Sequence, residues 1–170
     1  DIKVYVGGLP RVREGMYEYK AVFSPIDVIE EYTRPARYVR SGQVVTEPAL
    51  TGRELLEFEE VGTLEAFNTD GLRTLLTTIA CPNMIEKTMR YPGHVEKMLL
   101  LRETGFFDRN PLEINGQKVS PLDLTARLLF PMWEMKPGDE DVTVMRIVVE
   151  GRKEGKKYRY RYDLLDRFDT

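Results

Sequence analysis

The sequence predicts an α+β fold: a single domain in which helices cover a mixed, largely antiparallel β-sheet. Three observations support this prediction. Short runs of β-branched and aromatic residues, bounded by glycine and proline, indicate about seven or eight strands. Three longer stretches carry apolar residues at helical spacing behind recognisable start signals. The 170 residues contain no internal repeat, linker or composition shift that would divide them into two domains.

The chain opens with a predicted strand. Residues 2–6 form an apolar, β-branched run that stops at residues 7–10 (GGLP), a pattern typical of a buried strand that enters a loop. The sequence lacks an initiating methionine and begins inside this element. We therefore expect residues 1–170 to be a domain excised from a longer protein.

Residues 17–33 predict a short strand followed by a helix. Ser24 is a favoured N-cap residue and Pro25 suits the first helical position. Phe23, just before the cap, either packs on the helix as a hydrophobic staple or faces a ligand. One face of the helix is apolar and should pack against the core: Val28, Ile29 and Tyr32.

Further strands are expected on both sides of residue 50. Residues 34–48 read as two strands around a Ser41-Gly42 turn, which is a hairpin. Residues 57–67 supply additional strand material.

The segment of residues 65–107 predicts, in order, a strand, a tight turn, a helix, a strand, a Pro-Gly turn and a helix. Two polar clusters, residues 68–71 (NTDG) and residues 88–94 (TMRYPGH), lie where strands lead into helices. Ligands commonly bind at such junctions, because helix N-termini direct N–H groups at them. The first helix should bury an apolar face formed by Leu72, Leu75, Leu76 and Ile79 before Pro82 ends it.

The second polar cluster is the stronger site candidate. Thr88 and Arg90 alternate with Met89 and project from the same strand face as Glu86, which is either a solvent face or a binding face. Because Pro92-Gly93 turns the chain directly into a helix, Arg90 and the helix N-terminus could converge on one anion, such as a substrate carboxylate. His94, the only histidine, falls in the first helical turn, where a neutral, hydrogen-bonding ring is favoured.

The C-terminal third predicts a helix and a final pair of strands. Ser120 and Pro121 open a helix that continues through residue 130. The aromatic and methionine cluster around Trp133 is expected in the core or at an interface. Residues 142–150 and 157–162 form two strands, and the tyrosine and arginine alternation in the second indicates a solvated sheet face.

Composition excludes several classes of function. A net charge of −3 and a pI near 5.4 give no electrostatic reason to expect nucleic acid or an anionic membrane. A single cysteine, no signal peptide and no membrane-spanning apolar run fit a soluble, cytoplasmic protein. There is no dinucleotide-binding or phosphate-binding glycine motif, and one cysteine and one histidine do not make a metal site.

An ordered series of motifs resembles the catalytic, non-Rossmann domain of the saccharopine dehydrogenase family, and is most similar to its lysine 6-dehydrogenase branch. The resemblance covers roughly the whole chain, and its motifs are concentrated before residue 110. They lie at residues 6–10, 19–25, 30–37, 65–73, 88–94 and 105–107.

The resemblance implies a domain of the saccharopine dehydrogenase C-terminal type within a two-domain enzyme that oxidises an amine. NAD or NADP would be bound mainly by a Rossmann domain that this chain lacks, and hydride would leave the carbon bearing the amine. This domain would bind the small amino-acid substrate and contribute to a homodimer. Alone, it should be inactive.

Individual positions carry over from the resemblance. Phe23 stands where saccharopine reductases place a tryptophan beside nicotinamide and substrate, and Ser24 follows it. Thr88 and Arg90 match a segment that grips the amino acid, which makes Arg90 the expected α-carboxylate clamp. The expected substrate site also contains the first polar cluster and the histidine: Asn68, Thr69, Asp70 and His94.

Thr69 departs from the family pattern, because it replaces the arginine of an Asn-Arg-Asp segment. An arginine would suit an additional substrate carboxylate, so its absence favours lysine over saccharopine. Two alternatives stay open: a saccharopine or carboxynorspermidine dehydrogenase domain, and a non-catalytic dimerisation module built on the Trp133 cluster and the sheet ends.

Overall fold

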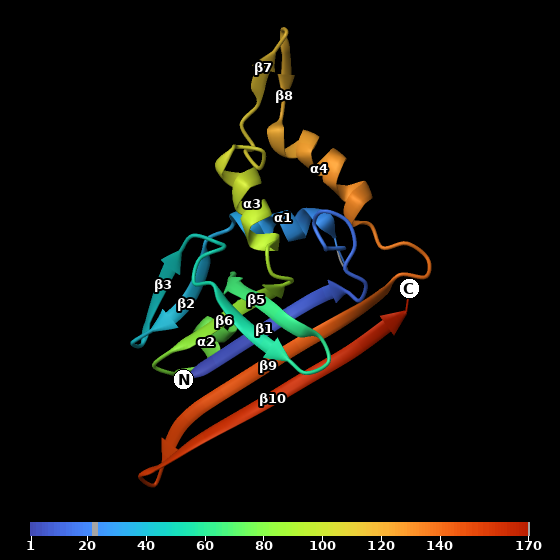
Figure 1. Cartoon of the computed structure of the whole chain (residues 1–170). Helices are drawn as coiled ribbons and strands as arrows, with labels where there is room; N and C mark the ends of the chain where they lie inside the picture. The colour runs from blue at the N-terminus through green and yellow to red at the C-terminus, as the bar shows by residue number, and fades with distance from the viewer. Residues whose placement is uncertain (22–23, 170) are drawn as a thin grey trace.

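The computed structural model describes residues 1–21 and 24–169 (Figure 1). Their largest element is an eight-stranded sheet in which β10, β9, β1, β6, β2 and β3 are neighbours in that order, while β5 pairs with both β4 and β6. Among the described strand pairs of this sheet, only β1–β6 is parallel. The predicted mixed, largely antiparallel sheet is therefore confirmed. The strands of the sheet are β1 (Ile2–Pro10), β2 (Ala36–Arg40), β3 (Gln43–Glu47), β4 (Glu54–Phe58), β5 (Gly62–Asn68), β6 (Met84–Arg90), β9 (Glu140–Lys153) and β10 (Lys156–Asp169).

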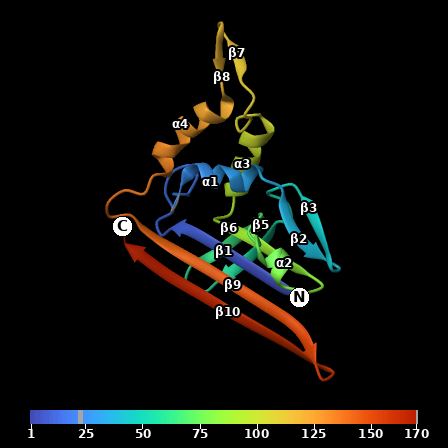
Figure 2. The same cartoon turned by 180° about the vertical axis from the view of Figure 1, so that it is seen from behind.

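Three helices gather on one side of this sheet, as Figures 1 and 2 show from opposite directions. They are α1 (Pro25–Thr33), α3 (His94–Glu103) and α4 (Pro121–Trp133). A small hairpin of β7 (Leu112–Ile114) and β8 (Gln117–Val119) projects beyond α3 and α4 (Figure 1). None of the described helices is long and apolar enough to span a membrane.

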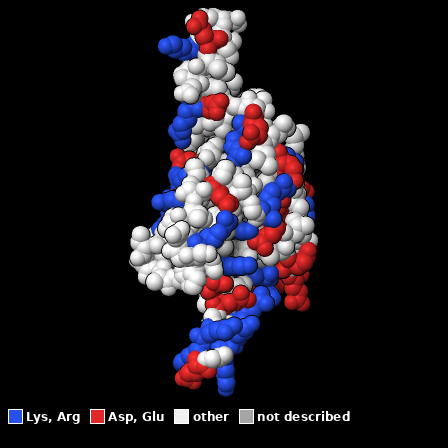
Figure 3. Space-filling view, turned by 90° about the vertical axis from the view of Figure 1, so that its left-hand side faces the viewer, with Lys and Arg blue, Asp and Glu red and all other residues white. Residues whose placement is uncertain are grey.

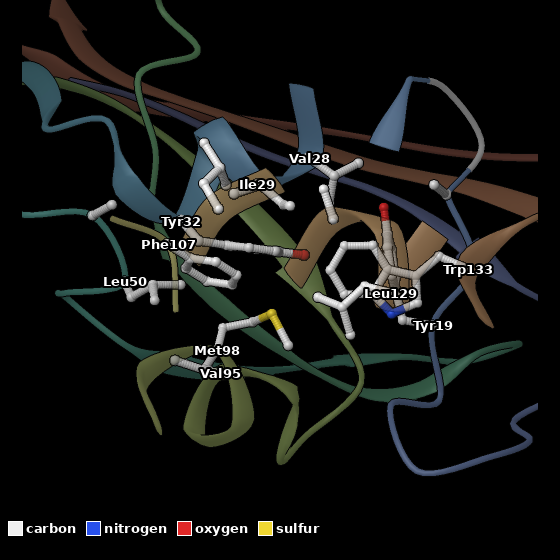
Figure 4. Packing of buried hydrophobic residues seen from close by; sticks show 14 of the residues in the cluster. Tyr19, Val28, Ile29, Tyr32, Leu50, Val95, Met98, Phe107, Leu129 and Trp133 are labelled. Atoms are coloured by element: carbon white, nitrogen blue, oxygen red, sulfur yellow. The ribbon is translucent and has the colours of Figure 1, made fainter. Parts of the chain in front are cut away.

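The three helices enclose a hydrophobic cluster in which Trp133 is fully buried beside Tyr19 and Leu129 (Figure 4). Val28, Ile29 and Tyr32 of α1 contribute to it, as their spacing predicts. The interface interpretation of the tryptophan cluster is therefore wrong for Trp133, although its neighbour Met132 is exposed.

A second cluster lies on the opposite face of the sheet from α1. Tyr5 and Met89 point to this face, where the β4–β5 ribbon covers them. The two faces of β1 and β6 thus have different environments, one an apolar core and one turned towards α1.

Strand β1 is longer than predicted, because the glycines and proline at residues 7–10 continue it. A Cβ atom at Gly7 would lie 2.9 Å from the carbonyl oxygen of Met89, so glycine permits the close approach of β6 at this point. Pro10 stands at the last position of the strand, where a missing N–H is tolerated.

The helix predicted after Asp70 is reduced to a single turn, α2 (Leu75–Thr78). Arg73 has a φ of 48°, which interrupts a right-handed helix before it can include Leu72. Leu72 is buried, whereas Leu75 and Ile79 are each 38% exposed. Leu76 is partly buried and packs against the cluster that contains Leu72, so the predicted apolar face is confirmed for Leu72 and Leu76 and is wrong for Leu75 and Ile79.

The N-terminal approach to α1 also differs from the prediction. Residues 17–20 form no strand, and Ala21 makes only an isolated bridge with Glu134. Ser24 occupies the N-cap position but makes no side-chain capping hydrogen bond. Phe23, with its predicted staple or ligand contact, lies outside the described residues.

Candidate functional site

A cavity of about 390 Å³ lies between α1 and the sheet. Its apolar wall comes from Val4, Val6 and Met145, which project from β1 and β9 on the face opposite Tyr5. Its polar residues come from α1, from β6 and from the loop that follows β5: Asp27, Glu30, Glu31, Arg34, Thr69, Asp70, Arg73, Glu86 and Thr88. Five carboxyl groups therefore face two guanidinium groups around this space.

A buried hydrogen-bond chain forms the polar floor of the cavity. The Thr69 hydroxyl donates to Glu86 Oε2 at 2.7 Å, and its oxygen lies 2.9 Å from the Thr88 hydroxyl. The Gly71 backbone N–H also donates to Glu86 Oε2, at 3.1 Å. Since the Thr69 proton is used on the carboxylate, the Thr88 hydroxyl donates to Thr69. Burial raises the pKa of Glu86 to about 7.

Asp70 lies at the edge of the same cavity but is paired. Its two carboxylate oxygens accept from Nε and Nη2 of Arg37, both at 2.8 Å, which is a bidentate ion pair. Burial would raise the pKa of Asp70, but the Arg37 pair outweighs it and holds that pKa below its ordinary value. Arg73 adds only a long contact of 3.8 Å to Asp70, so its guanidinium is available at the cavity.

Arg90 lies behind the cavity rather than in its lining. Its guanidinium donates to Glu31 at 2.7 Å, to the Met89 carbonyl at 2.9 Å and to the Tyr32 hydroxyl at 3.4 Å. It also lies over the Tyr19 ring, 4.7 Å from the centroid. Only 2% of this arginine is exposed, and Glu31 separates it from the space that a ligand could occupy.

The predicted convergence of Arg90 and the α3 N-terminus on one anion stays a prediction, because each contacts a different carboxylate of the chain itself in the described arrangement. Arg90 pairs with Glu31, and the backbone N–H of Gly93, the N-cap residue of α3, donates to Glu65 Oε2 at 3.4 Å. Glu65 is in turn held by Arg53, whose Nε donates to it at 2.6 Å. Glu31 and Glu65 therefore contact Arg90 and the start of α3 in this arrangement.

His94 is a neutral, buried, hydrogen-bonded ring, as the sequence predicts. Its Nδ1 lies 3.1 Å from the Tyr17 carbonyl, which can only accept, so Nδ1 carries the proton. Nε2 must then accept from the Tyr32 hydroxyl at 2.9 Å. Burial, with the nearby charge of Arg90, lowers the pKa of His94 to about 3. The ring does not line the cavity.

The remaining predicted residues are dispersed. Asn68 lines a second cavity beside β2 and donates to the Thr51 hydroxyl at 3.2 Å. Ser24 is exposed at the start of α1 and lies outside the cavity lining. Thus Thr69, Asp70 and Thr88 come together, whereas the other described candidates do not. Sequence reasoning did not select Glu86, although it lies on the same strand face as Thr88.

The cavity does not fit the phosphates of a dinucleotide. Its lining is predominantly acidic, and a pyrophosphate would place two further negative charges there without enough cations to balance them. Among residues 1–21 and 24–169, no group of three or more His, Cys, Asp or Glu side chains is arranged to hold a metal ion. The cavity instead suits a cation with an apolar stem.

Two comparisons identify proteins similar to this chain. The family model described as the saccharopine dehydrogenase C-terminal domain matches residues 1–170. Among solved structures, apo saccharopine dehydrogenase (L-Glu forming) from Saccharomyces cerevisiae superposes with a TM-score of 0.78 at 16% identity. That match covers 98% of this chain and 52% of the yeast chain, so this chain spans about half the length of the solved relative. The fold and the family match together show that the chain belongs to the saccharopine dehydrogenase C-terminal domain family.

Proposed function

We propose that this chain is the substrate-binding domain of an NAD(P)-dependent oxidoreductase that oxidises the amine-bearing side-chain carbon of lysine. In the complete protein it would be joined to a Rossmann domain that holds the dinucleotide. The acidic cavity beneath α1 carries the proposal, because it offers a buried carboxylate and hydroxyl oxygens to a substrate ammonium group. Family membership supplies the class of reaction.

The charge of the cavity supports a small cationic substrate. Lysine brings two ammonium groups and one carboxylate, whereas saccharopine brings three carboxylates to a lining that already holds five carboxyl groups. Thr69 supports the same choice, since it supplies a hydroxyl rather than a cation at the cavity floor. Arg73 and Arg34 are the guanidinium groups in the lining that could take the α-carboxylate. Carboxynorspermidine, a polyamine with one carboxylate, is the second candidate that this charge pattern favours.

The role of Arg90 as a carboxylate clamp stays a prediction. In the described arrangement its donors are used by Glu31, Tyr32 and Met89. Substrate could reach it only if the Glu31 side chain moved aside. Its more direct part in the proposed function is to hold Glu31 in place at the cavity wall.

The test is NADH formation by the complete protein with lysine, saccharopine and carboxynorspermidine in separate assays. We expect kcat/KM for lysine to exceed that for saccharopine by at least tenfold. The 170-residue chain alone should produce no NADH. A preference for saccharopine would contradict the lysine assignment while leaving the family intact, and activity with carboxynorspermidine alone would replace lysine by the second candidate.

We also propose that the domain forms a homodimer through the free edge of β10. This 14-residue strand pairs with β9 on one side and has no described partner on the other. Its charges are self-complementary: the first half is rich in lysine and arginine, and the second contains Asp163 and Asp166. Figure 3 shows the basic side chains gathered at the end of the β9–β10 hairpin. Antiparallel pairing of two copies would oppose the basic half of one strand to the acidic half of the other.

A further inference from the structure

Glu86 differs from the other buried carboxylates in having no cationic partner. Three acidic side chains among the described residues are buried: Glu65, Asp70 and Glu86. Arg53 pairs with Glu65, and Arg37 pairs with Asp70. Glu86 is only 6% exposed, yet its partners are the neutral donors Thr69 and Gly71. No lysine or arginine of the described residues lies within ion-pair distance of it.

A buried carboxylate without a cation is unfavourable, so it either takes up a proton or binds a cation. Both neutral donors bind the same atom, Oε2. The second oxygen, Oε1, has no hydrogen-bond partner among the described residues, although the side chain lines the cavity. Burial raises the pKa of Glu86 to about 7, so the two outcomes are closely balanced near neutral pH and a bound cation would favour the ionised form.

The surroundings of Glu86 specify the kind of cation. Thr69 and Thr88 place hydroxyl oxygens beside the carboxylate, which can accept further N–H bonds. The adjoining wall of Val4, Val6 and Met145 is apolar and suits a methylene chain. An ammonium group on an unbranched alkyl stem matches both features. A hydrated inorganic cation would match only the first, because oxygen ligands from the apolar wall are missing.

We propose that Glu86 is the specificity-determining residue of this domain and binds the terminal ammonium of an alkylammonium substrate through its free carboxylate oxygen. The identity of that substrate as lysine rests on the proposed function. The recognition itself does not, since it depends only on the unpaired carboxylate and the cavity beside it.

The test compares lysine with norleucine, which has the same stem without the terminal ammonium. Binding of each to the complete protein, without dinucleotide, is measured by isothermal titration calorimetry. We expect the wild-type protein to bind lysine at least tenfold more tightly than norleucine. Glu86→Gln should reduce this ratio to less than threefold, because glutamine keeps an acceptor for Thr69 and Gly71 but loses the charge.

The matched control is Glu65→Gln, which removes a buried carboxylate outside the cavity lining. Glu65 already pairs with Arg53, so the lysine-to-norleucine ratio should be preserved. Thermal unfolding and circular dichroism verify that both variants are folded. A second disruption, Gly71→Ala, places a Cβ atom 2.2 Å from Glu86 Oε2 and should displace the carboxylate, with the same loss of discrimination as Glu86→Gln.

Failure of this inference can be separated from failure of the proposed function. If wild-type protein does not discriminate lysine from norleucine, or if discrimination survives in folded Glu86→Gln, the role of Glu86 is overturned, whatever the NADH assay gives. If discrimination depends on Glu86 but lysine yields no NADH, the ammonium site is supported and lysine oxidation is contradicted.

Discussion

Arg90 shows how one buried side chain can organise several elements at the residue scale. Its guanidinium joins α1 through Glu31 and Tyr32, and Tyr32 continues the hydrogen-bond chain to His94 at the start of α3. Every link is internal to the chain. Removal of either Arg90 or Glu31 would leave the other charge without a partner in a largely buried position, which is unfavourable.

Replacement of Arg90 by alanine should destabilise the domain by about 3 kcal/mol, near the lower end for breaking a buried pair, since the Glu31 side chain retains 27% exposure. The double variant Arg90→Met with Glu31→Gln should recover much of this loss, because neither charge remains. Urea unfolding monitored by circular dichroism measures both. Arg109→Ala, which removes an exposed pair with Glu30, is the control and should change stability by less than about 1 kcal/mol.

A loss below about 1 kcal/mol in Arg90→Ala would contradict the structural role. The stable double variant also tests the carboxylate clamp in the complete protein. A tenfold rise in its KM for lysine, with kcat unchanged and with no such rise in Glu31→Gln alone, would indicate that Arg90 reaches the substrate.

Sequence reasoning could place only part of this site. Thr69 and Asp70 were selected because they stand where a predicted strand leads towards a helix, and Thr88 because it shares a strand face with Arg90 and matches a family segment. The structure brings the three together because β5 pairs with β6. Arg90 was assigned to an open site because its partner Glu31 is 59 positions away and nothing in the local sequence connects them. Glu86 shares a strand face with Thr88, but strand alternation cannot tell that its face is buried without a counter-charge.

At the scale of elements, the sequence correctly predicted helix starts and a hairpin turn, because residues close together in the chain determine these features. Helices α1 and α4 begin at the expected Ser-Pro pairs, and the β2–β3 hairpin turns at Ser41-Gly42. The errors arose where neighbouring strands decide the conformation. Strand β1 continues across Gly7 because β9 pairs with it at that position and β6 approaches closely, and neither contact is visible in the sequence of β1.

Gly7→Ala should therefore destabilise the sheet by about 2 kcal/mol. The added methyl would meet the Met89 carbonyl oxygen at 2.9 Å and the Met89 Cβ at 3.2 Å, which forces β1 and β6 apart. Gly151→Ala, in β9, is the matched control, because nothing lies within 4 Å of its added Cβ. Urea unfolding measures the stability of both variants, and equal stabilities would show that β6 moves aside without an energetic cost.

At the scale of the whole molecule, the sequence predicted one α+β domain, and the resemblance predicted its family. The order of strands was not predictable, because hydrophobic periodicity identifies strands but does not state which strand pairs with which. The position of the cavity depends on that order. The neighbouring strands β1 and β9 supply its apolar wall, and the facing wall comes from α1, through Asp27, Glu30 and Glu31.

The proposed dimer makes a prediction at this scale. Tyr160 and Tyr162 are 53% and 61% exposed in the basic half of β10, so the proposed pairing places them opposite the acidic half of the copy's strand. Changing both to glutamate sets like charges opposite each other and should shift the protein to the monomer in size-exclusion chromatography with light scattering. Leu128→Glu alters an equally exposed apolar residue on α4 and should leave the dimer intact. If the Leu128 variant were monomeric and the β10 variant stayed dimeric, the interface would lie on α4 instead.

The central position of β1 also affects how the chain can acquire its structure during synthesis. β1 pairs with β9 in a register that joins Ile2 to Val149, so β1 obtains its antiparallel partner only when nearly the whole domain has been translated. Contacts between such distant segments slow folding, because a long loop must close before the pairing stabilises it. Until then β1 can pair only with β6, and its other edge stays open, which is the kind of edge through which incomplete chains associate.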